Sequence, residues 1–204
     1  MPAQLSFDPA CTAVLSMDYQ TALVSIYAKE QEGLLVRARS VLGRARNLGM
    51  VVIHVQVAFR SNFPEISPRN ALLSALKTYW ATKHTFEGAA GAIHAAVAPE
   101  GEDIVVTKHR VNAFTGTDLE MILRAKNIDT LVLFGIATSG VVLSTLLHAA
   151  DEDYRLVVIK DCCADLNPEV HACLIDKVFP RQAAVVSASE FLDALKSVER
   201  PSLR

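Results

Sequence analysis

Short apolar runs alternate with amphipathic runs along almost the whole chain. The apolar runs are rich in valine, isoleucine and leucine and lack polar alternation, as expected of strands that are covered on both faces of a sheet. They lie at 12–17, 51–57, 104–107, 130–134, 156–160 and 183–186. Strand and helix patterns that alternate in this way predict an α/β fold. We therefore expect a three-layer, doubly wound parallel sheet of six strands with helices on both faces.

The segments between the strands carry helix signals. From Glu30 to Leu48, apolar residues recur every three or four positions, and Gly49 follows as a stop. Thr117 with Glu120, and Ser187 with Glu190, have the spacing of capping boxes. The helices expected from such patterns are 30–48, 69–80, 117–127, 141–150, a helix from Pro168 behind the N-cap Asn167, and 191–198. A loop is expected at 58–68, and 87–101 gives no clear pattern.

Composition and charge narrow the functional classes. The chain has 204 residues, 51% of them hydrophobic, which suits one domain over 1–204 with its core at about 11–198. With 20 basic and 22 acidic residues, it shows no basic footprint for nucleic acid. No apolar run reaches the roughly 20 residues of a membrane span, and residues 1–8 do not resemble a signal peptide. Four cysteines do not suggest a disulfide framework, so we expect a cytoplasmic protein.

Ligands of parallel α/β sheets bind at the carboxyl ends of the strands, which here selects a few polar positions. These positions are Asp18, 58–60, Lys108, 135–141 and Asp161. Asp18 and Lys108 together can transfer a proton, since a carboxylate and an ammonium group shift each other's pKa. A structural ion pair is the alternative reading of the same two residues.

The segment from Gly135 to Gly140 connects a predicted strand to a predicted helix. Its N–H groups can converge on an anion or a developing oxyanion. It can equally be a tight turn in which the two glycines supply backbone freedom. Neither a Walker lysine nor the G-x-G-x-x-G pattern is present, so a nucleotide site is not supported.

Three motifs carry a resemblance to a known family. They are Leu15-Ser16-Met17-Asp18-Tyr19-Gln20, then 107–110 with 113–119, then 135–142 with Thr145 and Ala149. In this order and at these strand ends, they make the chain similar to the isochorismatase-like hydrolases, also called cysteine hydrolases. That family includes nicotinamidases and carbamoylsarcosine amidohydrolases. The resemblance runs from about 11 to about 186.

The resemblance implies a site and also a departure from the usual chemistry. The family uses a strand-end Asp, a strand-end Lys and a Cys at the start of a helix, whose thiolate attacks an amide carbonyl. Asp18 and Lys108 match the first two, but Val141 stands where the nucleophilic Cys is expected. Acyl-enzyme chemistry is therefore not available at that position. The residues expected to form the pocket and the oxyanion loop are Phe59, Phe114, Ala137, Thr138 and Gly140.

Three functions remain open at this point. True isochorismatases of the same superfamily also lack the Cys and cleave a vinyl ether by protonation from the Asp, which predicts a hydrolase using Asp18 and Lys108 for C–O or C–N hydrolysis. A dicarboxylate such as isochorismate would need Arg60, Arg110 or Lys108. The second possibility is an inactive member that serves as a small-molecule-binding or assembly protein. The third is a thiol enzyme that uses Cys162 or Cys163.

The sequence predicts no metal and no cofactor. The Asp-x-His metal motif of the family's nicotinamidases is missing after the second strand, and we expect His54 to be a core residue inside that strand. The expected ligand is a small molecule, without a nucleic-acid or membrane partner. Because members of the family are commonly dimers or tetramers, we expect a homo-oligomer, with 69–80 and the Ala-rich segment after it as the interface, a lid or a core contact.

Overall fold

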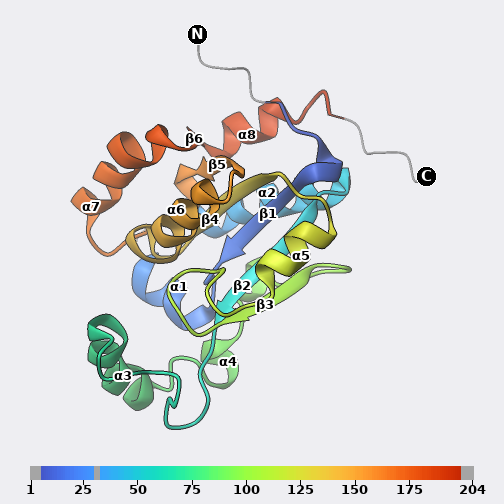
Figure 1. The fold of residues 1–204 in the computed structure, drawn as a ribbon. Helices are drawn as coiled ribbons and strands as arrows, with labels where there is room; N and C mark the ends of the chain where they lie inside the picture. The colour runs from blue at the N-terminus through green and yellow to red at the C-terminus, as the bar shows by residue number, and fades with distance from the viewer. Residues whose placement is uncertain (1–5, 30–32, 199–204) are drawn as a thin grey trace.

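The computed structural model describes residues 6–29 and 33–198, and it contains one parallel sheet of six strands (Figure 1). The strands follow the order β3-β2-β1-β4-β5-β6. Their bounds are β1 Thr12–Met17, β2 Val51–Val57, β3 Ile104–Lys108, β4 Thr130–Gly135, β5 Arg155–Ile159 and β6 Ala184–Val186. Every neighbouring pair is parallel, which confirms the predicted doubly wound sheet.

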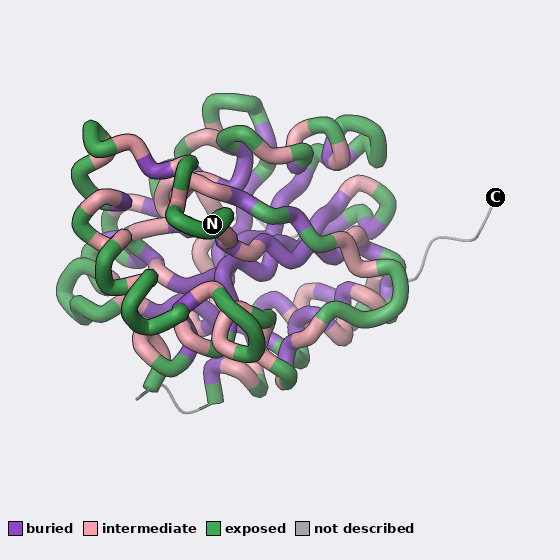
Figure 2. Tube along the Cα trace, turned by 90° about the horizontal axis from the view of Figure 1, so that it is seen from below, coloured by how far each residue is buried: buried purple, intermediate pink, exposed green. Residues whose placement is uncertain are grey.

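The strands lie where the apolar runs predict them. β1 and β2 have the predicted bounds, β3, β4 and β6 differ by one residue at one end, and β5 is displaced by one residue toward the N-terminus. Every residue of β1 and of β4 is buried, because these two strands are central and covered on both faces. Figure 2 shows this buried core running through the middle of the molecule, with the exposed segments around it. The parallel order brings the carboxyl ends of β1, β3 and β4 to one edge of the sheet.

Eight α-helices connect or flank the strands in the described part of the chain. They are α1 Thr21–Tyr27, α2 Leu34–Leu48, α3 Ala71–Lys83, α4 Gly88–Gly91, α5 Leu119–Ala125, α6 Leu143–Asp151, α7 Pro168–Cys173 and α8 Ala188–Ala194. In Figure 1, α5 and α6 lie on one face of the sheet and α2 on the other. α8 packs against α2, which completes the three layers.

The helix signals were correct in most places. The apolar positions that recur every three or four residues in α2 are buried, as predicted. The helix is capped by Gly49, whose φ of 76° lies in the left-handed region that glycine adopts readily. It begins at Leu34, and the predicted start at Glu30 lies outside the described residues. Ser187 and Glu190 form the predicted capping box of α8, and Asn167 caps α7.

Two predictions were wrong in detail. Thr117 and Glu120 do not form a capping box: the Thr117 hydroxyl donates to the carbonyl of Ala113 at 2.7 Å, and Glu120 accepts from Arg124. Asp118 is the N-cap of α5 instead. The predicted tight loop and the helix from Val141 also differ, since Thr138–Val142 forms a π-helical turn before α6 begins at Leu143.

The segment between β2 and β3 leaves the sheet and carries α3 and α4 (Figure 1). α3 buries only Leu73 and exposes Leu72 and Tyr79. The subunit contact expected at this segment stays a prediction, as does the oligomeric state. No helix in the described ranges combines the length and apolar character required to cross a membrane.

Candidate active site

Asp18 is the first residue after β1, and its backbone is unusual. Its φ is 59°, in the left-handed region that residues other than glycine rarely adopt. Aspartate tolerates this region better than most residues, and the N–H of Asp18 is fixed by donation to the carbonyl of Val55 at 2.8 Å. The chain therefore turns sharply at the end of β1 and holds the carboxylate at the edge of the sheet, where only 5% of the residue is exposed.

Lys108 is the last residue of β3, two strands away from β1. Its ammonium group lies 2.8 Å from Oδ2 of Asp18 and donates a second hydrogen bond to the carbonyl of Arg110 at 3.0 Å. Both side chains are almost fully buried. The two strand ends therefore lie close together, as predicted, and their side chains form a direct ion pair.

The second carboxylate oxygen of Asp18 has a different environment. Oδ1 is buried and has no hydrogen-bond partner among the described residues. Burial raises the pKa of the Asp18 carboxyl, although the adjacent Lys108 ammonium acts in the opposite direction. The site therefore holds an acid that is more readily protonated than an exposed aspartate.

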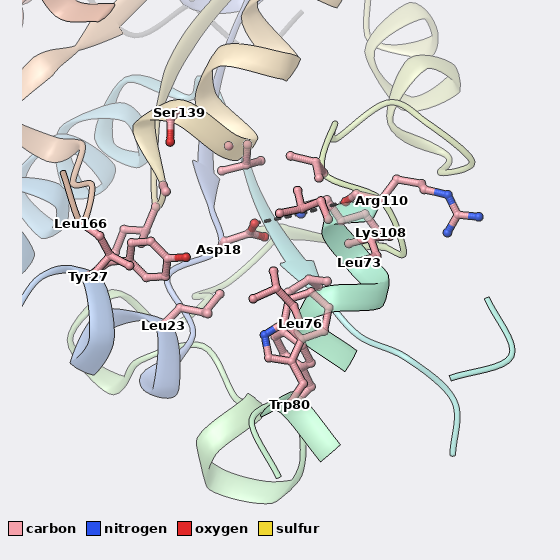
Figure 3. A pocket seen from close by; sticks show the side chains of 18 of the residues that line it. Asp18, Leu23, Tyr27, Leu73, Leu76, Trp80, Lys108, Arg110, Ser139 and Leu166 are labelled. Atoms are coloured by element: carbon pink, nitrogen blue, oxygen red, sulfur yellow. Dashed lines mark hydrogen bonds and ion pairs between the residues drawn. The ribbon is translucent and has the colours of Figure 1, made fainter. Parts of the chain in front are cut away.

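A cavity of about 370 Å³ lies beside this pair (Figure 3). One side of its lining is polar and includes Asp18, Lys108 and Tyr27, whose hydroxyl points toward the cavity in Figure 3. The opposite side is apolar and comes mainly from α3 and from the end of β2. Of the predicted pocket residues, Phe59, Ala137, Gly140 and Val141 line the cavity.

The turn after β4 presents Val141 to the cavity but uses most of its N–H groups internally. The N–H of Thr138 donates to the carbonyl of Ala164 at 2.8 Å, and the N–H of Gly140 to the carbonyl of Ala137 at 3.1 Å. The N–H of Ser139 donates to the Asp165 carboxylate at 2.7 Å. These three N–H groups already have partners and are not free to bind an anion. They therefore do not form the anion site that was expected at this loop.

Two predicted pocket residues lie elsewhere. Phe114 is buried beside α6, where its ring stacks on His148 with centroids 4.5 Å apart. It faces away because the turn after β3 carries it across to α6. Thr138 is fully buried, and its hydroxyl lies 2.8 Å from Nδ1 of His171. Thr138 therefore anchors the turn to α7 instead of lining the cavity.

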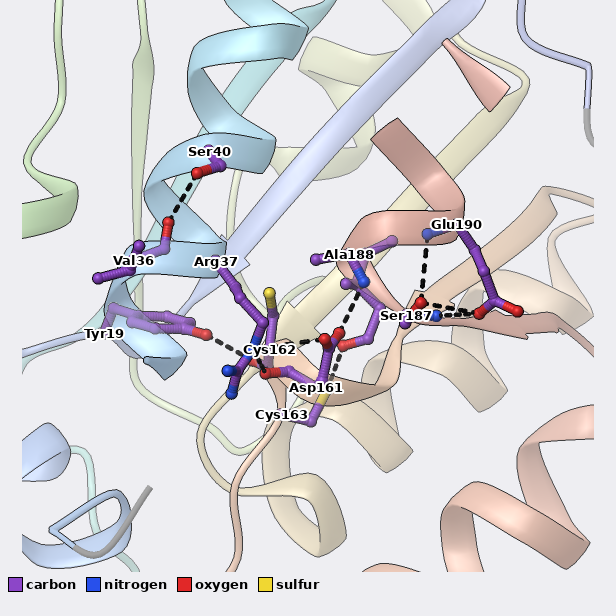
Figure 4. A network of polar contacts seen from close by, with 11 residues as sticks. Tyr19, Val36, Arg37, Ser40, Asp161, Cys162, Cys163, Ser187, Ala188 and Glu190 are labelled. Atoms are coloured by element: carbon purple, nitrogen blue, oxygen red, sulfur yellow. Dashed lines mark hydrogen bonds and ion pairs between the residues drawn. The ribbon is translucent and has the colours of Figure 1, made fainter. Parts of the chain in front are cut away.

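Cys162 and Cys163 are buried behind the sheet edge and do not line the cavity. Figure 4 shows them among Tyr19, Arg37 and Asp161. Burial raises the pKa of the Cys162 thiol far above its ordinary value and that of Cys163 to about 12. Neither is a thiolate near neutral pH, so the third predicted function loses its nucleophile. Asp161, another predicted candidate, pairs with Arg37 at 3.3 Å and accepts from the N–H of Ala188.

The remaining candidate ligands serve the scaffold. His54 lies within β2, 3.1 Å from Asp103, the residue before β3, and Asp103 also binds Arg46. Arg60 pairs with Glu65 at 2.7 Å outside the cavity lining. Among the described residues, no three His, Cys, Asp or Glu side chains converge to hold a metal ion. The expected absence of a metal stays a prediction.

The sequence did not reveal Tyr27 or the leucines of α3 as cavity residues. α1 has only seven residues, too few for a clear period, and it was not predicted at all. Trp80 also lines the cavity, and its place in the wall depends on how α3 packs.

The sequence model of the isochorismatase family, described as "Isochorismatase domain", matches residues 12–190. The chain belongs to the isochorismatase family. This family assignment confirms the resemblance that the three strand-end motifs indicated.

Individual relatives cover nearly the whole chain. The uncharacterized isochorismatase family protein YecD of Escherichia coli O157:H7 is 30% identical over 94% of this chain and 100% of its own length. The maleamate amidohydrolase of Pseudomonas putida is 25% identical over 87% of this chain and 82% of its own. A solved cysteine hydrolase from Pseudomonas syringae pv. phaseolicola 1448A superposes with a TM-score of 0.83 at 20% identity, covering 94% of this chain and 95% of that one. The chain is therefore a member of a hydrolase family with the fold of that structure.

Proposed function

We propose that this protein hydrolyses a C–O or C–N bond of a small molecule without a covalent enzyme intermediate. Asp18 and Lys108 carry the reaction, and the cavity beside them holds the substrate. The relatives support hydrolysis as the reaction class, since one of them is named as an amidohydrolase.

The unpaired oxygen of Asp18 is the observation that carries this proposal. A buried carboxylate in a purely structural role normally has hydrogen bonds to both oxygens, because an unpaired buried polar atom costs free energy. Asp18 uses Oδ2 for Lys108 and leaves Oδ1 without a protein partner among the described residues. A substrate or water in the cavity supplies the missing partner.

The proton transfer follows from this arrangement. Protonated Asp18 donates its proton to the substrate, at the vinyl carbon of a vinyl ether or at the leaving heteroatom of a related bond. Water attacks the carbon that becomes electron-poor, and one proton of that water returns to Asp18. For a vinyl ether, the other proton of the water passes to the leaving oxygen as the C–O bond breaks and the carbonyl forms. For a related bond, the leaving heteroatom departs with the proton that it received from Asp18. Lys108 stabilises the carboxylate that exists between the two transfers.

Val141 explains why water is the proposed nucleophile. By the resemblance it occupies the position of the family's Cys, and its side chain has no nucleophilic atom. It lies in the cavity wall and is 2% exposed, so it also limits the space beside Asp18. The reaction therefore depends on acid–base chemistry instead of an acyl-enzyme.

A comparison of wild type with Asp18→Asn tests the proposal. A panel of vinyl ethers, esters and amides is assayed with both proteins, and Asp151→Asn, an exposed carboxylate on α6, serves as the matched control. We expect turnover to fall by about 10²-fold or more in Asp18→Asn alone, as is usual for a general acid. Equal turnover by wild type and Asp18→Asn on every substrate found would refute the proposal.

The alternative is a family member that binds a small molecule without converting it. The observation in its favour is Val141, which removes the usual nucleophile while the cavity persists. In that case ligands bind, but no substrate is turned over, and the Asp18–Lys108 pair contributes only to stability.

A further inference from the structure

We propose that the substrate of this site is an uncharged small molecule with one hydrogen-bonding end and an apolar body. The inference rests on the proposed function, because it assumes that the cavity beside Asp18 is the substrate site. It goes further by naming the class of molecule that the cavity walls select.

The apolar body is assigned from the wall opposite Asp18. Phe59 stacks on Trp80 with ring centroids 5.5 Å apart, and Phe86 meets Trp80 edge-on at 5.1 Å. Leu73 and Leu76 of α3 extend this surface toward the cavity in Figure 3. A continuous aromatic and aliphatic wall binds apolar groups by removing them from water.

The hydrogen-bonding end is assigned from the opposite side. Oδ1 of Asp18 is without a partner among the described residues, and the Tyr27 hydroxyl points toward the same part of the cavity (Figure 3). An amide placed there accepts from the Tyr27 hydroxyl and donates its N–H to Oδ1 of Asp18. The polar end of the ligand then lies at the reacting groups and its body lies against Trp80.

The charged side chains that line the cavity indicate that the ligand carries no net charge. Only two cations line the cavity in the described part of the chain, Lys108 and Arg110. Lys108 is already paired with Asp18, and the Arg110 guanidinium donates to the carbonyl of His109 at 2.7 Å. In Figure 3 this guanidinium points away from Asp18.

The acidic side chains strengthen the argument. Asp165 also lines the cavity, and its carboxylate is held by the N–H groups of Ser139 and Asn167. A carboxylate substrate would therefore meet two protein carboxylates, while Lys108 is paired with Asp18 and the Arg110 guanidinium is bound to the His109 carbonyl and directed away from Asp18. Burial of a charge that lacks a partner is strongly unfavourable, so the cavity selects against anions.

Trp80 makes this inference directly measurable. It is the single tryptophan of the chain and lies in the apolar wall, so its fluorescence reports on ligands in the cavity. The probes are benzamide with its 4-carboxylate, and hexanamide with its ω-carboxylate, each pair differing by one charged group. We expect each uncharged probe to bind with a dissociation constant at least about tenfold lower than its carboxylate, a difference of about 1.4 kcal/mol.

Two variants separate this result from the proposed reaction. Asp18→Asn is titrated with the uncharged probes, and retained binding supports the inference whether or not turnover is lost. Leu76→Asp places a charge in the apolar wall and is expected to weaken the uncharged probes at least about fivefold, or roughly 1 kcal/mol. Leu147→Asp, on the exposed side of α6 and outside the cavity, is the matched control and is expected to leave binding unchanged.

Three outcomes overturn the inference. The first is equal or tighter binding of either carboxylate. The second is a carboxylate that binds in wild type and loses its affinity in Arg110→Gln, which would mean that the guanidinium turns inward. The third is no saturable change in Trp80 emission with either uncharged probe up to its solubility limit. Loss of turnover in Asp18→Asn affects none of these readouts, so the two proposals fail independently.

Discussion

Gly135 of β4 lies so close to Met17 of β1 that a Cβ on Gly135 would be 2.6 Å from the Met17 carbonyl oxygen. Met17 immediately precedes Asp18, so this close approach fixes the backbone that carries the catalytic candidate. A larger residue at position 135 must separate the two central strands where the site is built.

Gly135→Ala is expected to destabilise the protein by about 1–3 kcal/mol, because the added methyl group overlaps the Met17 backbone. Urea unfolding measures the change. Gly43→Ala is the matched control: nothing lies within 4 Å of its added Cβ in α2, and an alanine there is expected to stabilise by about 0.5–1 kcal/mol. Equal stability changes in the two variants would contradict the crowding at β1 and β4.

Because Asp18 and Lys108 form a buried ion pair, we expect substitutions at the two positions to have non-additive effects on the free energy of unfolding. Lys108→Met and Asp18→Asn each leave one buried group without its partner, and each is expected to cost about 3–5 kcal/mol. The double variant removes the mismatch and is expected to cost less than the sum of the two. Chemical denaturation of the four proteins provides the cycle. Additive effects would mean that the two groups do not stabilise each other.

The raised pKa of Asp18 predicts a pH dependence with a definite sign. The folded state holds the Asp18 proton more tightly than the unfolded chain, whose pKa is about 3.9. This contribution to stability is complete below the unfolded pKa and is lost as pH rises through the folded one. If protonated Asp18 is the acid, kcat/KM also falls as pH rises through that folded pKa. A kcat/KM profile that rises over this window would assign Asp18 as a base instead.

The cysteines are expected to differ in reactivity. Cys173 is exposed, whereas Cys162 and Cys163 are buried and their pKa values are raised by burial. Iodoacetamide on the folded protein, followed by mass spectrometry of peptides, is expected to label Cys173 and to leave 162 and 163 unmodified. Labelling of the buried pair at the rate of Cys173 would reopen the possibility of a thiol enzyme at this sheet edge.

Val141→Cys is expected to restore a reactive thiol. The new side chain would lie in the cavity wall with Asp18 and Lys108, next to groups that assist its ionisation. We expect iodoacetamide to modify position 141, and Asp18→Asn to slow that modification in the double variant. A thiol at 141 that reacts no faster than Cys162 would show that the site no longer supports a nucleophile there.

The sequence predicted what depends on strand order and burial. The bounds of β1 and β2 followed from unbroken apolar runs, and Asp18 and Lys108 were found because parallel strands end at one edge. The pairing of Asp18 with Lys108 was expected, but their direct contact at 2.8 Å could not be predicted, because a contact across β2 depends on the register of three strands. The same holds for the unpaired Oδ1, which is a property of the packed site.

The errors have identifiable physical causes. The spacing of Thr117 and Glu120 suits a capping box, but the backbone carbonyl of Ala113 competes for the Thr117 hydroxyl. Phe114 follows a strand end, yet the ring of His148 on α6 holds it away from the cavity. Tyr27 and Leu76 come from α1 and α3, and their positions depend on tertiary packing that no local pattern encodes.

The segment between β2 and β3 separates the site into two parts that can vary independently. The proposed reacting groups stand on the ends of β1 and β3, while most of the apolar wall comes from the segment that carries α3 and α4. Replacement of that one contiguous stretch would exchange the wall and leave the strands that hold Asp18 and Lys108 intact. The architecture is therefore suited to diversification by segment exchange, in evolution or in the laboratory.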